Sequence, residues 1–198
     1  MKFFKSLSAL TALILTSIVF SSTALAQSTV LVVDQARVIR ESDVGKHIKR
    51  QLQSIGKQMG VEMKSDYSPL TSERDRLVKE LKGMDMAALK SRPDLQKRAA
   101  TLKQKVEKSQ LEEAYKQKEL QFTEQKALQK VNAKLTTILE ALVKERNADV
   151  LLDRSLVIYS GKSVDVTSTV ISRLNSQMRT VSVIRERLPR KPFPGGQK

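Results

Sequence analysis

The fold is decided by residues 52–81, whose sequence is LQSIGKQMGVEMKSDYSPLTSERDRLVKEL. The apolar residues of this stretch recur at steps of three, four or seven positions, which places them in one stripe along one face of a helix. They are Leu52, Ile55, Met59, Met63, Tyr67, Leu70, Leu77 and Leu81. Pro69 lies inside the stretch and is expected to kink the helix or break it locally, because proline removes a backbone donor.

A second helical stretch of comparable length follows a break at residues 91–94. Its stripe has two parts, Leu95, Ala99, Leu102 and Val106, and then Leu128, Val131, Leu135, Ile138 and Leu142. Two stretches that are joined tightly must run antiparallel, and a single stripe on each can be buried in a coiled-coil hairpin. The sequence therefore predicts a helical hairpin arm over residues 41–147, with a wet and bendable part between residues 107 and 119. At 1.5 Å per residue, roughly 45 residues would reach about 65 Å.

Short apolar runs rich in β-branched residues lie on both sides of the arm. Residues 30–33 form one run, and residues 150–153 and 156–159 form two more around a turn, so three strands are expected. A short amphipathic helix follows the last of them. The arm is therefore expected to be an insertion into a small α+β body made of residues 27–40 and 148–180.

The predicted strands are apolar on successive residues, which indicates burial on both faces. Three strands and one short helix in a single copy could hardly supply that burial. Homo-oligomerisation through the strands is the economical solution. The residues expected to form this contact are Val30, Leu31, Val32, Val33, Val150, Leu151, Leu152, Leu156, Val157, Ile158 and Tyr159.

Residues 1–26 have the order of a secretory signal peptide. Lys2 and Lys5 give a positive start, an apolar run extends over residues 7–20, and residues 24–26 are Ala-Leu-Ala, a cleavage pattern. The apolar run is short for a membrane span of about 20 residues, so cleavage is favoured over an uncleaved anchor. We expect the mature chain to be exported to the periplasm.

The mature chain is strongly basic. The formal charge of +15 falls to +13 when Lys2 and Lys5 are removed, which favours partners with acidic surfaces. The chain contains no cysteine, and this excludes disulfides and thiolate metal sites. Residues 181–198 hold three prolines, two glycines and several cations, so they are expected to form a disordered basic tail.

No catalytic constellation is present in the sequence. It contains no phosphate-binding loop, no nucleophile elbow and no metal-ligand spacing. His47 is the single histidine and is expected to be exposed, while Asp149 and Asp153 flank a strand and are expected to cap it or to form a turn. We therefore expect no enzymatic activity, no cofactor and no metal.

Motifs at both ends of the mature chain carry a resemblance to a known family. They are Val32-Val33-Asp34, Arg37-Val38, Gly45-Lys46, Ala148-Asp149-Val150-Leu151-Leu152-Asp153, Val157-Ile158-Tyr159, Val164-Asp165-Val166-Thr167, Val170-Ile171 and Arg173-Leu174-Asn175. Over residues 30–175 the chain resembles the Skp/OmpH family of periplasmic chaperones, and the arm matches in pattern and length. The resemblance implies a trimer with a β-barrel-like body and three helical tentacles. It also implies a cavity that holds unfolded outer-membrane proteins without ATP.

A holding surface must contact many sequences weakly, so flexible methionines and long-range charge suit it. Met59 and Met63 are expected to fill the hairpin seam instead. From residue 74 to residue 108, eleven Lys and Arg stand against five acids, which leaves +6 on the distal arm and exceeds what a solvated coiled-coil face needs. The candidate client-binding residues are Met84, Met86, Leu89, Arg74, Arg76, Lys79, Lys82, Lys90, Arg92, Lys97 and Arg98.

The predicted function is an ATP-independent holding chaperone that delivers unfolded outer-membrane proteins toward outer-membrane assembly. From the residues alone, a basic coiled-coil binding protein of the cell envelope or of nucleic acid is the alternative. The signal peptide and the lack of interleaved aromatic residues argue against nucleic acid, and the absence of a cysteine for lipidation argues against an anchored spacer. Some members of this family are linked to lipopolysaccharide, so lipopolysaccharide or an anionic membrane surface is a further expected partner.

Overall fold

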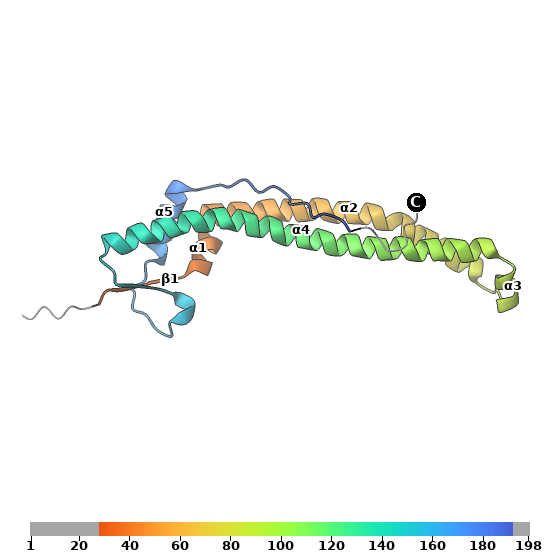
Figure 1. The fold of residues 1–198 in the computed structure, drawn as a ribbon, viewed down its shortest axis with the longest axis horizontal. Coiled ribbons are helices and arrows are strands. Elements are labelled where there is room, and N and C mark those ends of the chain that lie inside the picture. The colour runs from red at the N-terminus through yellow and green to blue at the C-terminus, as the bar shows by residue number, and fades with distance from the viewer. Residues whose placement is uncertain (1–27, 192–198) are drawn as a thin grey trace, which may run out of the picture.

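The computed structural model describes residues 28–191, which form a small body and a long two-helix arm that extends from it (Figure 1). The predicted signal peptide, residues 1–26, lies outside the described residues. Within residues 28–191, no helix is both long enough and apolar enough to cross a membrane. The expected combination of long helices with a small sheet is confirmed.

The sheet of the body is formed by β1 (Val30–Val33) and β2 (Val150–Asp153), which pair in parallel along their whole length. On the other edge of β1, Val32 makes an isolated parallel bridge to Asp165. β1 is therefore flanked on both edges, and all its residues except Val30 are buried. The burial expected from its run of successive apolar residues is found within a single copy of the chain.

The third strand expected at residues 156–159 is absent, and this prediction is wrong. The carboxylate of Asp153 accepts the N–H of Ser155 (2.8 Å), so the chain turns into a short 3₁₀ helix, η1 (Arg154–Leu156), directly after β2. Beyond η1 the backbone is irregular, and three large apolar side chains of this loop are exposed. An apolar run predicts a strand only if a partner strand is available, and the segment that bridges β1 comes later in the chain, at Asp165.

The core lies where the arm joins the body. α1 (Gln35–Glu41) and α5 (Thr167–Gln177) pack against each other and against the long helices of the arm. The buried side chains of this core are Leu31, Val33, Val38, Val44, Ile48, Ala127, Val131, Leu135, Ile138, Leu142, Val166, Val170 and Leu174. The larger part of them comes from the arm, which explains how so small a body has a core at all.

The arm is built from two long helices joined by a short one. α2 (Asp43–Leu81) leads away from the body, α3 (Met86–Lys90) lies at the tip, and α4 (Pro93–Glu145) returns (Figure 1). The turn after α2 passes through Gly83, whose φ of +84° is a left-handed conformation that favours glycine. Asn147 follows α4 with a φ of +46°, a common way for a helix to end.

The two long helices run antiparallel, as their ion pairs show. Glu62 of α2 pairs with Lys116 of α4, whereas Glu73, further along α2, pairs with Arg98 near the start of α4. A kink or a local break was expected at Pro69, and of these the break is wrong, because α2 continues through this residue. A proline in a helix interior costs about 3 kcal/mol, so we infer that packing against α4 offsets this cost.

The chain after α5 forms an extended segment, residues 179–191, which we call the C-terminal strap. It leaves the body and runs along the arm beside the two long helices (Figure 1). Val181 and Val183 pack against the core, and two arginines further along pair with carboxylates of the arm. The expectation of a disordered tail is therefore wrong for residues 181–191, while residues 192–198 lie outside the described part of the chain.

A substitution at Gly45 tests the fold, because the junction between α1 and α2 has no room for a side chain at this position. A Cβ at this position would lie 1.6 Å from the carbonyl oxygen of Ile39, at the end of α1. Gly45→Ala should therefore force the two helices apart and lower the free energy of unfolding by at least about 1–3 kcal/mol. Urea unfolding followed by circular dichroism measures this loss.

Gly60→Ala is the matched control, since nothing lies within 4 Å of a Cβ at that position of the same helix. Alanine is about 1 kcal/mol more favourable than glycine in a helix interior, so this variant should be slightly more stable than the natural chain. Equal stability of the two variants would contradict the tight α1–α2 junction.

Candidate functional site

The predicted client-binding residues gather at the end of the arm farthest from the body. They are Arg74, Arg76 and Lys79 on α2, Lys82 at its end, Met84 in the following turn, Met86, Leu89 and Lys90 on α3, Arg92 just before α4, and Lys97 and Arg98 on α4. Met86 is 71% exposed, while Met84 and Leu89 are partly buried. Met59 is buried between the long helices, as expected.

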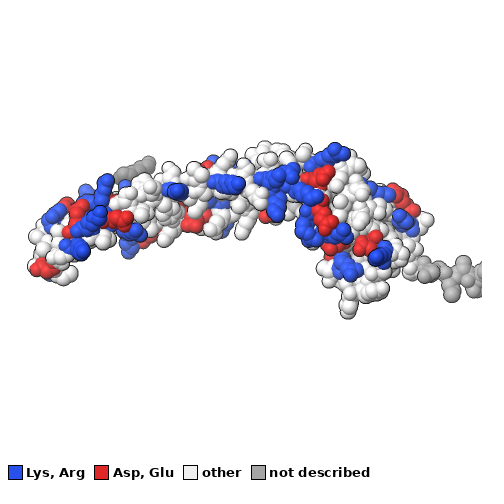
Figure 2. All heavy atoms as spheres, turned by 180° about the vertical axis from the view of Figure 1, so that it is seen from behind, with Lys and Arg blue, Asp and Glu red and all other residues white. Residues whose placement is uncertain are grey.

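Three of the eight predicted cations are neutralised within the chain. Arg74 and Arg92 each pair with an aspartate one or two residues further on, at 2.8 Å. Arg98 pairs with Glu73 (2.9 Å) and Glu80 (2.8 Å) of α2, so it ties the two long helices together. In the described part of the chain, five predicted cations have no carboxylate at ion-pair distance: Arg76, Lys79, Lys82, Lys90 and Lys97. Figure 2 shows Lys and Arg side chains spread along the back of the molecule, from the tip of the arm to the body.

The ion pair at the start of α4 joins two residues that are close in the sequence and both charged at neutral pH. The Arg92 guanidinium donates to Asp94 and holds the pKa of this carboxyl at about 2, with help from the N–H groups of the helix N-terminus. Both groups therefore stay charged at neutral pH and cancel each other. The five cations without a carboxylate partner are the ones available to an acidic ligand.

An apolar groove opens between the long helices in the same part of the arm, with a volume of about 460 Å³. We call it the distal groove, and its lining residues are Arg74, Leu77, Val78, Leu81, Ala99, Leu102, Lys103, Val106, Glu107 and Gln110. Val78 is 60% exposed, so a large apolar side chain faces water here. The two cations of its lining are paired, Arg74 with Asp75 (2.8 Å) and Lys103 with Glu107 (4.0 Å), so the groove itself is apolar and close to neutral.

Sequence reasoning predicted the charge of the distal arm but missed this groove. We expected the seam between the helices to bury the stripe residues Leu77, Leu81, Leu102 and Val106. Val78 lies directly after a stripe residue and therefore on another face of α2. A large apolar residue off the stripe was the one available signal.

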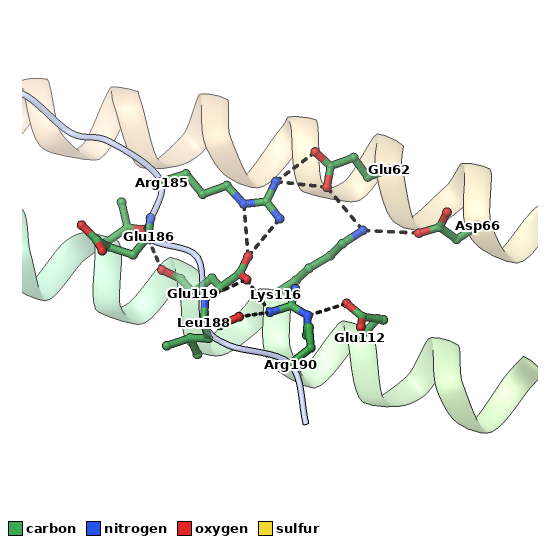
Figure 3. Close-up of polar contacts among 10 residues, drawn as sticks. Glu62, Asp66, Glu112, Lys116, Glu119, Arg185, Glu186, Leu188 and Arg190 are labelled. Atoms are coloured by element: carbon green, nitrogen blue, oxygen red, sulfur yellow. Dashed lines mark hydrogen bonds and ion pairs between the residues drawn. The ribbon is translucent and has the colours of Figure 1, made fainter. Parts of the chain in front are cut away.

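A second polar site lies halfway along the arm, where the strap meets both long helices (Figure 3). We call it the mid-arm ion cluster, and it consists of Glu62, Asp66, Glu112, Lys116, Glu119, Arg185 and Arg190. The guanidinium of Arg185 contacts Glu62 of α2 (2.9 Å) and Glu119 of α4 (3.0 Å). One strap side chain thus links the two helices.

Glu119 is the centre of this cluster and is fully buried. Burial by itself would raise the pKa of its carboxyl, but hydrogen bonds from Arg190, from the N–H of Leu188 and from Arg185 outweigh that effect and keep the pKa below its ordinary value. The pKa of Glu62 is also lowered, chiefly by its hydrogen bond from Arg185. Both carboxylates are therefore charged at neutral pH and hold the strap arginines.

This cluster was not predicted, because its two parts, the middle of α4 and the C-terminal strap, are far apart in the sequence. The thin stripe before Glu119 suggested a wet helix, and the basic composition of the tail suggested disorder. The buried positions of α4 here are Lys116, Glu119, Thr123 and Ala127, at steps of three or four, so polar residues occupy a helical seam. A polar seam needs hydrogen-bond partners. The strap supplies those of Glu119 and Thr123, while carboxylates of α2 pair with Lys116.

Comparison with known proteins agrees with the arrangement of long helices on a small body. Residues 29–174 match the family described as outer membrane protein (OmpH-like). The crystal structure of a protein from Caulobacter crescentus described as an OmpH-like outer membrane chaperone is similar, with 30% sequence identity and a TM-score of 0.68, and the match covers 82% of this chain and 93% of that one. No curated protein matches the chain closely. The resemblance to the Skp/OmpH family is confirmed, and the chain belongs to the OmpH-like family.

Proposed function

We propose that the mature chain is an ATP-independent periplasmic chaperone that holds unfolded outer-membrane proteins between helical arms and delivers them toward outer-membrane assembly. The family supports a chaperone role and contains no enzymes. The signal-peptide pattern of residues 1–26 supports export. The single observation that carries the proposal is the distal groove with the cations around it.

The distal groove suits weak contact with many chains. Its floor is aliphatic and its volume of about 460 Å³ accepts one or two side chains of an extended segment, not a folded domain. Each such contact contributes little, so a client can move between sites and is not trapped. An unfolded β-barrel protein has apolar residues at every second position, and these can enter grooves of several arms in turn.

The cations without a carboxylate partner can attract a client before it touches the arm. Arg76, Lys79, Lys82, Lys90 and Lys97 attract acidic segments over distances set by the Debye length, about 8 Å at physiological salt. Lipopolysaccharide or an anionic membrane surface would be drawn to the same cations. The charge brings a client to the arm, and the apolar groove keeps it there.

The proposal also requires several arms, and we propose that they are brought together by a homo-oligomer, a trimer in line with the family. The loop after β2 supports this, because Leu156, Ile158 and Tyr159 are 78%, 104% and 83% exposed in a single chain. Exposed apolar clusters of this kind mark protein interfaces. Among the predicted oligomerisation residues these three and Val150, which is 41% exposed, are available to a second copy, whereas Leu31, Val32 and Val33 are already buried.

Replacing Leu156, Ile158 and Tyr159 together by serine should dissociate the oligomer, because the interface would lose its apolar contacts. Light scattering with size-exclusion chromatography measures the mass of the mature protein. Met86→Ser is the control, since this side chain is 71% exposed at the far end of the arm, and it should leave the mass unchanged. A triple variant that keeps the oligomeric mass of the natural protein would contradict the proposed interface.

The holding function is tested by diluting a urea-unfolded outer-membrane β-barrel into buffer with a few-fold excess of the mature protein and no nucleotide. The natural protein should suppress light scattering by the aggregating client. Val78→Ser should weaken client binding roughly three- to ten-fold, because burying a valine side chain contributes at most about 1.5 kcal/mol.

Val61→Ser is the matched control on the same helix, since Val61 is 70% exposed and lies nearer the body. It should protect the client as well as the natural protein does. Failure of the natural protein to suppress aggregation at low and physiological salt, together with tight binding of DNA or peptidoglycan, would overturn the chaperone proposal in favour of a basic coiled-coil binding protein.

A further inference from the structure

The strap lies on the one part of the arm whose seam is polar. Towards the tip α4 buries Leu95, and towards the body it buries Val131, but between them its buried side chains include Lys116, Glu119 and Thr123. Polar side chains contribute little to helix–helix association unless their hydrogen bonds are satisfied. Here α2 supplies Glu62 and Asp66 as partners of Lys116, and a third element, the strap, completes the hydrogen bonds of Glu119 and Thr123.

Three backbone N–H groups of the strap are held by side chains of α4. The N–H of Glu186 donates to the Thr123 hydroxyl (2.9 Å), the N–H of Leu188 to the Glu119 carboxylate (3.2 Å), and the N–H of Lys191 to the Tyr115 hydroxyl (3.3 Å). Within residues 28–191, no backbone–backbone hydrogen bond joins the strap to the arm. The strap is thus bound as an extended peptide in a side-chain site, not as part of a sheet.

Two arginines five residues apart provide the strongest contacts of the strap. Arg185 joins Glu62 of α2 to Glu119 of α4, and Arg190 donates to the other oxygen of Glu119 (2.7 Å) and to Glu112 (2.9 Å). Arginine is suited to such sites because its planar fork binds two acceptors at once. The guanidinium of Arg190 also lies 4.5 Å from the centre of the Tyr115 ring.

Docking of the strap sets its side-chain contacts against the entropy of the free chain. Ordering a residue of backbone costs about 1–2 kcal/mol, so the full length of the strap opposes its own contacts. Because the strap shares no backbone–backbone hydrogen bond with the arm within residues 28–191, its release breaks side-chain contacts and leaves the backbone hydrogen bonds of α2 and α4 in place. Segments held in this way open before the core does.

We propose that Glu62, Glu112 and Glu119 form a docking site for an extended segment with two arginines five residues apart, and that the strap of the same chain is its resident ligand. The docked strap clamps α2 to α4 across the polar seam, and its release frees the middle of the arm to bend. The site lies on the arm between the distal groove and the body. This inference does not depend on what the arms hold.

The test uses a fluorescent peptide of residues 179–191 and three forms of the full-length mature protein. In one form Arg185 and Arg190 are both replaced by glutamine, which empties the site. In the charge-matched control Arg179 and Arg187 are replaced by glutamine; neither pairs with a carboxylate in the described part of the chain. The third form is the natural sequence.

The peptide should bind the Arg185→Gln/Arg190→Gln protein, and adding Glu119→Gln should abolish that binding. Its apparent affinity for the natural protein and for the charge-matched control should be at least about ten-fold lower, because their own straps occupy the site. Equal binding of the peptide to all three forms, or binding that survives Glu119→Gln, would show that the basic peptide binds by non-specific charge attraction. Either result would overturn the proposal. Absence of peptide binding to the Arg185→Gln/Arg190→Gln protein, with its helical circular dichroism intact, would overturn it as well.

A second measurement needs no peptide. The chain has no cysteine, so a spin label can be attached at Ile184→Cys, a strap position that is 72% exposed. Its spectrum should be broad in the natural background and should sharpen in the Arg185→Gln/Arg190→Gln background, but not in the charge-matched control. A sharp spectrum in the natural background would show that the strap is not docked and would contradict the proposal. The measurement needs no client protein.

Discussion

The structure depends on the burial of one narrow apolar stripe on each of two long helices. Neither stripe is wide enough for a globular core, so each helix must lie along the other. At the body this pairing gains further layers, and Val38, Val44, Leu142 and Leu174 become fully buried. The small sheet is held by this shared core, which is why the arm and the body form one folding unit despite their different shapes.

Departures from that stripe give the arm three zones with different roles. Near the body the seam is apolar and the helices are fixed. Halfway along, polar seam residues such as Glu119 leave a gap that the strap fills. Near the tip the seam opens into the distal groove, and Val78 faces water. A fixed root, a middle bridged by the strap and an apolar groove near the tip would suit the proposed holding of unfolded chains.

Local patterns made the arm, β1 and β2 predictable, because spacing and side-chain type determine them directly. What could not be predicted depends on contacts between distant residues. The run at residues 156–159 has strand character but no partner strand, and Pro69 stays in a helix because α4 lies alongside it. The strap was predicted to be disordered from its composition, since nothing local indicates that Arg185 meets Glu62 and Glu119, residues far away in the sequence. The cations of the site were predicted, and the neutralisation of Arg98 by Glu73 and Glu80 depended on the fold.

Clients are proposed to bind at the distal arm. Hydrogen–deuterium exchange of the mature protein, with and without an unfolded outer-membrane β-barrel, can locate the bound client. New protection is expected at residues 74–106, on both helices around the distal groove, with little change at the body around Val170. Protection confined to the body, or no protection of the distal arm while the client stays soluble, would contradict this proposal.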